Sequence, residues 1–268
     1  MQAIKRLIPN LLTAGNLVGG IMAIIFTLTG KIELAPYCIF LSAIFDFLDG
    51  FVARLLNVQS ELGKQLDSLA DMVTFGVAPG IIMMAILQAA FRRFYYPEFV
   101  LVNDPLIEFV VAYGHFFSLI IPVFALFRLA KFNLDTRQTD SFIGLPTPAM
   151  TLFFAVFPIL VLDYTYPVSP YILQEATWQS WVIVHMLGHP IVLIIVISIM
   201  SIFMVSEIHL FSLKFKHFKF KGNEIRFIFL TICVVLLATL FLWAIPLIII
   251  LYIILSLINN AIKPKHEV

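Results

Sequence analysis

Long apolar runs constrain this chain more than any other feature of its sequence. Each extends for about twenty residues, the length that an α-helix needs to cross the hydrocarbon core of a bilayer. A backbone in lipid must satisfy its own hydrogen bonds, so the runs predict helices. We therefore expect an all-α polytopic integral membrane helical bundle with about eight transmembrane helices. The expected spans are residues 10–28, 34–55, 66–88, 109–128, 146–162, 189–206, 227–243 and 245–262.

The composition supports a membrane protein and argues against nucleic acid as a partner. Hydrophobic residues make up 61% of the chain and charged residues 12%, with a mean hydropathy of +1.01. A net charge of +1 provides no field that would attract a polyanion. Cys38 and Cys233 lie inside apolar runs, which is typical of small buried side chains rather than of a disulfide framework.

The pattern along the chain predicts a single membrane domain over residues 1–268. We expect a catalytic core that begins with residues 1–150 and extends to about 206, followed by C-terminal helices over about 227–262. A tight turn near residues 244–246 is expected between the last two spans. Pro9 and Asn10 predict a helix start, since proline suits the first turn and asparagine is a good N-cap.

Basic residues collect on one side of the predicted spans. Fourteen of the 17 Lys and Arg fall on the side of the two termini. Cytoplasmic loops of membrane proteins carry such an excess, so we expect both termini in the cytoplasm. The three basic residues on the opposite side are Lys31, Arg92 and Arg93.

Four aspartates interrupt the second and third apolar runs. Asp46 and Asp49 are three residues apart, and Asp67 and Asp71 are four apart, so each pair shares one face of its helix. The short connection makes the two helices antiparallel neighbours, which brings the four carboxylates together at the cytoplasmic edge. A charged aspartate costs about 2.5–3.5 kcal/mol at the centre of a bilayer, and clustered anions also repel one another. The cluster therefore predicts bound cations.

The chemistry of the ligands indicates which cations. Carboxylate oxygens without a matching His or Cys cluster favour hard divalent ions such as Mg²⁺ or Mn²⁺ over zinc. Four carboxylates can hold two ions and leave one group for proton transfer, an arrangement that suits phosphoryl transfer. A divalent-cation transporter is the alternative from a different class, because carboxylates within membrane spans also mark ion pathways.

The spacing of these residues resembles the signature of the CDP-alcohol phosphatidyltransferase family. It reads D-x2-D-G-x2-A-R-x8-G-x3-D-x3-D from Asp46 to Asp71 and matches that signature at every fixed position. Members of the family are integral membrane enzymes that move a phosphatidyl or similar group from a cytidine diphosphate carrier to an alcohol and release CMP. Three further segments, at 9–20, 67–79 and 127–149, resemble the phosphatidylserine synthase branch. Lys131 stands where that branch often has arginine, which keeps the charge and loses the planar fork.

The resemblance implies roles for particular residues. Asp46, Asp49, Asp67 and Asp71 would ligate two Mg²⁺ or Mn²⁺ ions, with Asp71 also the general base. CDP-diacylglycerol would be bound by Gly50, Ala53, Arg54 and Gly63. Polar residues recur in the first span at Asn10, Thr13 and Asn16, and of these Asn10 and Thr13 are expected to contact the nucleotide.

The acceptor implied by the phosphatidylserine synthase branch is L-serine. Its carboxylate needs a basic partner, for which Arg128 is the expected residue, with Lys131 and Asn133 near it. Another acceptor, glycerol 3-phosphate or inositol, stays open as the alternative within the family. Family membership also implies a homodimer in the lipid bilayer, and we expect a bacterial cytoplasmic membrane with the active site facing the cytoplasm.

Overall fold

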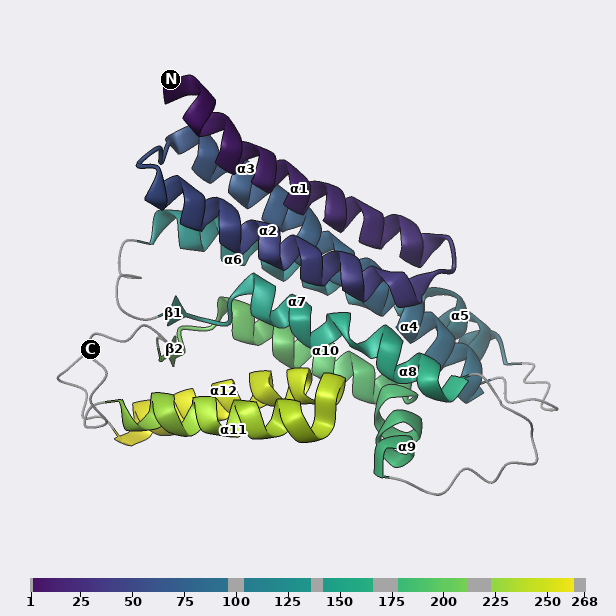
Figure 1. The fold of residues 1–268 in the computed structure, drawn as a ribbon. Helices are drawn as coiled ribbons and strands as arrows, with labels where there is room; N and C mark the ends of the chain where they lie inside the picture. The colour runs from purple at the N-terminus through teal and green to yellow at the C-terminus, as the bar shows by residue number, and fades with distance from the viewer. Residues whose placement is uncertain (1, 96–103, 136–141, 166–177, 212–222, 263–268) are drawn as a thin grey trace.

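The computed structural model describes residues 2–95, 104–135, 142–165, 178–211 and 223–262, and these are almost entirely helical. The chain forms a bundle of antiparallel and crossing helices, with a single pair of short strands in the described part (Figure 1). The helices are α1 (Gln2–Leu28), α2 (Ala35–Leu55), α3 (Glu61–Asp71), α4 (Ala78–Tyr95), α5 (Pro105–Tyr113), α6 (Ile120–Leu134), α7 (Thr147–Ala155), α8 (Phe157–Thr165), α9 (Trp178–Val182), α10 (Pro190–Val205), α11 (Glu224–Leu240) and α12 (Ala244–Ile262). The strands are β1 (Phe142–Ile143) and β2 (His209–Leu210).

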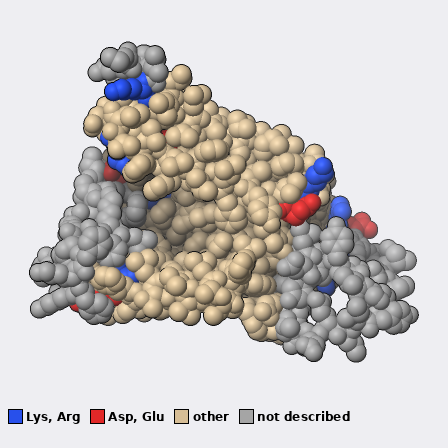
Figure 2. All heavy atoms as spheres, in the orientation of Figure 1, with Lys and Arg blue, Asp and Glu red and all other residues tan. Residues whose placement is uncertain are grey.

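Four helical stretches are long and apolar enough to cross a membrane, and this confirms an all-α membrane protein. They are Leu7–Leu28, Glu61–Tyr95, Pro105–Leu134 and Glu224–Ile262. Two shorter apolar helices cover Thr147–Val161 and Pro190–Val205. Each of the eight expected spans falls on helical residues, while a count of eight crossings stays a prediction. Figure 2 shows charged side chains near the two ends of the visible face, with uncharged residues between them.

The helices lie in layers (Figure 1). α1 and α2 pack side by side as an antiparallel pair, and α3 packs against α1. α7 and α10 lie between these helices and the α11–α12 hairpin. The main core includes the buried side chains of Ile39, Ile82, Ile121, Phe154 and Leu193. α1 begins and α12 ends at the same end of the bundle, where α2 also turns into α3.

A π-helical turn, Met72–Val77, joins α3 to α4 and keeps them continuous. Such a turn disturbs the regular backbone hydrogen bonds, and other groups satisfy those that are displaced. Here the hydroxyl of Thr151, on α7, donates to the carbonyl oxygen of Phe75 at 2.8 Å. The hydroxyl of Thr74 donates to the carbonyl oxygen of Asn16 on α1 at 3.0 Å. The turn thereby ties the acidic helix α3 to two other helices.

Two local predictions are wrong. α1 begins at Gln2, so Pro9 lies inside the helix and Asn10 does not cap it. The turn between the last two helices is at Phe241–Trp243, where Phe241 has φ of 54°, rather than at residues 244–246. Pro246 lies within the first turn of α12, a position that proline tolerates because its missing N–H has no partner there.

The pairing of β1 with β2 fixes the segment that follows α6. Phe142 is opposite Leu210, and Ile143 is opposite His209, in an antiparallel pair. The backbone N–H of Leu145 donates to the carbonyl oxygen of Phe203 at 2.9 Å. Gly144 has φ of +74°, and an added Cβ would lie 2.9 Å from the carbonyl oxygen of Ser206. A side chain at this position would strain the turn, so glycine is needed there.

Candidate active site

The connection between α2 and α3 is short and capped at both ends. Asn57 takes φ of 52° after the end of α2, and the N–H of Val58 returns to the carbonyl oxygen of Ala53 at 3.0 Å. A left-handed residue of this kind commonly ends a helix. Ser60 then caps α3, since its Oγ accepts from the N–H of Gly63 at 3.1 Å. These two caps turn the chain tightly enough to place the acidic faces of α2 and α3 together.

The aspartates on the two helices converge as expected. Carboxylate oxygens of Asp46, Asp49 and Asp67 all lie within 4.8 Å of one another. Asp46 also interacts with the side chain of Asp71, so the fourth aspartate adjoins the same group. Asp49 and Asp71 are buried, while Asp46 and Asp67 are partly exposed.

Polar side chains on α1 hold two of these carboxylates. The hydroxyl of Thr13 donates to Oδ2 of Asp49 at 2.5 Å. One turn further along α1, Nδ2 of Asn16 donates to Oδ1 of Asp71 at 3.0 Å. α1 therefore forms a third wall of the acidic site, beside α2 and α3.

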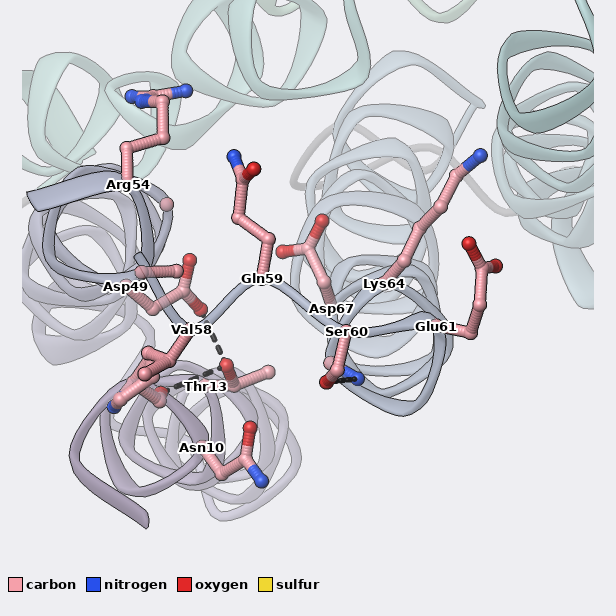
Figure 3. A pocket seen from close by; sticks show the side chains of 14 residues that line it. Asn10, Thr13, Asp49, Arg54, Val58, Gln59, Ser60, Glu61, Lys64 and Asp67 are labelled. Atoms are coloured by element: carbon pink, nitrogen blue, oxygen red, sulfur yellow. Dashed lines mark hydrogen bonds between the residues drawn. The ribbon is translucent and has the colours of Figure 1, made fainter. Parts of the chain in front are cut away.

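A cavity of about 540 Å³ opens beside the carboxylates. In Figure 3, Asp49 and Asp67 lie on facing walls, with Thr13 and Asn10 on α1 beside them. The lining comprises Pro9, Asn10, Thr13, Asp49, Gly50, Ala53, Arg54, Val58, Gln59, Ser60, Glu61, Gly63, Lys64 and Asp67. All six residues that were expected to contact the nucleotide are in this set. Asp46 and Asp71 are not, because they lie in the adjoining carboxylate cluster.

Arg128 lies in a buried position in the C-terminal half of α6. Its side chain is only 4% exposed, and its guanidinium carbon lies 5.2 Å from the ring centroid of Phe132. Its Nε donates to the carbonyl oxygen of Leu145 at 3.3 Å, which joins α6 to the segment between β1 and α7. Arg128 does not line the cavity described above.

The two other residues that were expected near the acceptor have partners within the protein. Lys131 forms an ion pair with Glu207, beyond the end of α10. Nδ2 of Asn133 donates to Oγ of Ser68 on α3 at 2.8 Å, and Nζ of Lys64 donates to the carbonyl oxygen of Asn133 at 3.1 Å. Asn133 thus lies against the residue next to Asp67, although it does not line the cavity either.

The residues present fit hard divalent cations. The cluster offers oxygen donors from three side chains, with a fourth carboxylate adjoining them, and such ligands are those that Mg²⁺ and Mn²⁺ prefer. The N-terminus of α3 lies at the same cavity, because Ser60, Glu61 and Gly63 line it. A helix N-terminus carries a partial positive charge and favours phosphate groups. The arrangement suits a ligand with a pyrophosphate.

Asn16 contacts the aspartate cluster, although the sequence analysis did not include it among the site residues. Its spacing from Thr13 placed it on a polar stripe of the first span, which was the available signal. Its partner Asp71 is 55 residues away in the chain, so only the packing of α1 on α3 makes the contact visible.

Comparisons of the sequence with known proteins identify a family. The sequence model of the CDP-alcohol phosphatidyltransferase family matches residues 6–186, which include all four aspartates and most of α1. A CDP-diacylglycerol–serine O-phosphatidyltransferase of Bacillus subtilis is 32% identical over 217 residues, covering 81% of this chain and 94% of the relative. A protein of the same name from Helicobacter pylori is 36% identical over 162 residues, or 60% of each chain. The one from Saccharomyces cerevisiae is 40% identical over 136 residues, or 46% of this chain and 41% of the relative.

Proposed function

Since the chain belongs to the CDP-alcohol phosphatidyltransferase family, we propose that it transfers the phosphatidyl group of CDP-diacylglycerol to the hydroxyl of L-serine, giving phosphatidylserine and CMP. The observation that carries this proposal is the convergence of four aspartates from α2 and α3 beside a cavity that two of them, Asp49 and Asp67, line. Relatives named as enzymes of this reaction, one of which aligns with 81% of the chain, support serine as the acceptor.

Two divalent ions, Mg²⁺ or Mn²⁺, would be held by the four aspartates Asp46, Asp49, Asp67 and Asp71. When bound, such ions neutralise a pyrophosphate and stabilise a leaving phosphate oxygen. Thr13 supports this role, because its hydrogen bond orients the carboxylate of Asp49 without using both of its oxygens. Three clustered carboxylates in an apolar bundle also need counter-charge, which the ions would supply.

The nucleotide would lie in the cavity of about 540 Å³. Gly50 leaves this space open, since an added Cβ there would have its nearest neighbour, Nη2 of Arg54, at 3.9 Å. Ala53, Gly63, Asn10 and Thr13 would provide the rest of the surface for the cytidine diphosphate. Arg54 would bind phosphate oxygens, for which its planar group is suited.

Asp71 would act as the general base. It would take the proton of the serine hydroxyl while the hydroxyl oxygen forms a bond to the β-phosphorus, the one that carries diacylglycerol. The bond from that phosphorus to the oxygen bridging to CMP would break, and CMP would leave with the electron pair. Direct transfer is favoured over a covalent intermediate. The cavity lining contains two hydroxyl groups that could act as nucleophiles, and both have structural partners: that of Thr13 donates to Asp49, and that of Ser60 caps α3.

The acceptor serine would lie toward α6. Arg128 would bind its carboxylate, with Lys131 and Asn133 at the edge of the same region. The link from Asn133 to Ser68 supports this position, because it places the end of α6 directly against the acidic helix. Glycerol 3-phosphate and inositol are the alternative acceptors, and either would give a different lipid from the same donor.

The membrane arrangement completes the proposal. Eight spans with both termini in the cytoplasm would put the acidic site at the cytoplasmic surface of a bacterial cytoplasmic membrane, in a homodimer. α2 ends, α3 begins and α6 ends at the end of the bundle where α1 begins (Figure 1), and these helix ends carry Arg54, Lys64 and Lys131, which supports that orientation. A divalent-cation transporter is less favoured, because the carboxylates lie at one end of the bundle beside a nucleotide-sized cavity.

The test is release of CMP by the purified protein supplied with CDP-diacylglycerol. We expect release to require both L-serine and Mg²⁺ or Mn²⁺, to stop on chelation, and to return when either ion is added back. Asp46→Asn should shift the metal concentration for half-maximal rate upward by tenfold or more, since it removes a charged ligand. A rate of CMP release that is the same with and without serine, or that is unchanged after complete chelation of the metal, would reject the proposal.

A further inference from the structure

Asn16 is a fully buried polar residue in the middle of α1, with 0% of its surface exposed. Its side-chain nitrogen has one partner, Oδ1 of Asp71. Its side-chain oxygen, Oδ1, is buried and has no hydrogen-bond partner among the described residues. A buried amide that serves packing alone normally has both ends satisfied, because an unpaired acceptor is costly. The Asn16 side chain is therefore oriented by the Asp71 carboxylate alone.

The backbone of Asn16, in contrast, carries the packing contacts. Its carbonyl oxygen accepts from Oγ of Ser42 on α2 at 3.1 Å and from Oγ1 of Thr74 in the π-helical turn at 3.0 Å. One turn further along α1, a Cβ added to Gly20 would lie 2.8 Å from Cα of Thr74. These contacts bring α1 close to α2 and to the π-helical turn, and none of them uses the side chain of Asn16.

The orientation of the amide is also determined by this single contact. If the amide were turned over, its oxygen would face the Asp71 carboxylate, and two acceptors would oppose each other. With nitrogen toward Asp71, Oδ1 of that carboxylate has its donor, and the neighbouring Asp46 is the other side chain that the carboxylate contacts. Asp49 is held in a comparable way by Thr13, but only Asp71 receives its hydrogen bond from a side chain with no other role in the structure.

We propose that Asn16 is a positioning residue for the reaction. It holds Oδ1 of Asp71 so that the second carboxylate oxygen faces the hydroxyl of the acceptor alcohol and takes its proton. The inference rests on the proposed role of Asp71 as general base and does not depend on which alcohol is the acceptor. Among the four aspartates, Asp71 is the one that Asn16 orients.

The test compares kcat with KM in Asn16→Leu, which keeps a similar shape and removes the donor. We expect kcat to fall by tenfold or more, with the KM values for CDP-diacylglycerol and for the acceptor within about twofold of the wild type. Ser42→Ala is the matched control, because it removes a contact to the backbone of the same residue. It should lower thermal stability and leave kcat nearly unchanged. If Asn16→Leu does not fold, Asn16→Ser replaces it in the experiment. This variant should likewise show a lower kcat with nearly unchanged KM values.

A double-mutant comparison separates positioning from a general loss of structure. Asp71→Glu moves the carboxylate away from the amide, so Asn16→Leu should cost much less in that background than in the wild type. An equal fold-loss in both backgrounds, or a rise in both KM values with kcat unchanged, would overturn the inference. Failure of the proposed function would be seen separately, as a wild-type protein that releases CMP with another alcohol or with none.

Discussion

Helices α1–α3, of which α1 and α2 are apolar, and the apolar hairpin α11–α12 differ in what their polar side chains contact. At the acidic site, polar side chains of α1 pair with carboxylates of other helices, as Thr13 does with Asp49 and Asn16 with Asp71, whereas Thr27 further along α1 donates to the carbonyl oxygen of Ala23 in its own helix. In the hairpin, Thr239 and Ser256 donate to carbonyl oxygens of their own helices. Polar contacts between side chains of different helices therefore indicate a site, whereas contacts to a helix's own backbone allow a polar residue to lie in an apolar environment.

The two regions also differ in what they pack around. The hairpin closes on a small aromatic cluster in which Phe211 and Phe229 have ring centroids 5.7 Å apart, with Tyr252 against both. α1–α3 instead surround carboxylates and an open cavity. We expect substitutions in the first region to change chemistry and those in the second to change stability, and the following predictions test this division from the largest effect to the smallest.

Asp71→Asn should reduce turnover by about 10²–10⁴-fold, because it removes the proposed base while keeping the shape of the side chain. Binding of CDP-diacylglycerol, measured by calorimetry in detergent, should be partly retained. Absence of the variant protein from the membrane would make Asp71 a structural residue and would break the division between the two regions.

Two glycines near the site should respond in opposite ways to leucine. Gly50→Leu should fold normally and raise the KM for CDP-diacylglycerol by tenfold or more, since the side chain would enter the cavity. Gly20→Leu should lower the free energy of unfolding by about 1–3 kcal/mol or prevent folding, because α1 is too close to Thr74 for a side chain. Thermal unfolding and substrate titration of both variants check these expectations. A stable Gly50→Leu variant with an unchanged KM would show that the nucleotide does not bind in this cavity.

Arg128→Ala should raise the KM for serine at least tenfold and change that for CDP-diacylglycerol much less, because the guanidinium is the proposed partner of the serine carboxylate. Arg128→Lys, which keeps the charge, should have an intermediate effect. The competing role for Arg128 is a structural one, through its buried contact with Leu145. Equal increases in both KM values would favour that reading and reject the acceptor assignment.

Tyr252→Phe should have the smallest effect on catalysis. It removes the hydrogen bond from the tyrosine hydroxyl to the carbonyl oxygen of Phe211, which is 2.9 Å long. We expect a loss of about 1 kcal/mol in the free energy of unfolding, with kcat/KM for serine unchanged. A tenfold loss of kcat/KM without a change in stability would show that the hairpin contributes to the active site.

Much of the acidic site could be predicted from the sequence, because helical periodicity is local. The faces of Asp46 with Asp49 and of Asp67 with Asp71 follow from spacing, and the short connection between α2 and α3 brings them together. The π-helical turn could not be predicted in the same way. It depends on Thr151, which lies 76 residues from its partner Phe75.

The acceptor region shows the same limit. The segment F-R-L-A-K-F-N identified Arg128 and Asn133 by resemblance, but their partners come from distant elements. Leu145 lies beyond β1, and Ser68 lies on α3. Local sequence can propose which residues belong to a site, whereas the contacts that orient them arise from packing between helices.

The most direct test of the account is identification of the lipid that the purified protein makes from CDP-diacylglycerol. Wild type and Asp71→Asn would each be supplied with L-serine, glycerol 3-phosphate or inositol in the presence of Mn²⁺, and the lipids analysed by mass spectrometry. We predict phosphatidylserine from the wild type with serine, in amounts equal to the CMP released, and little product from the variant. A glycerophosphate or inositol lipid in place of phosphatidylserine, or full activity in Asp71→Asn, would contradict the account.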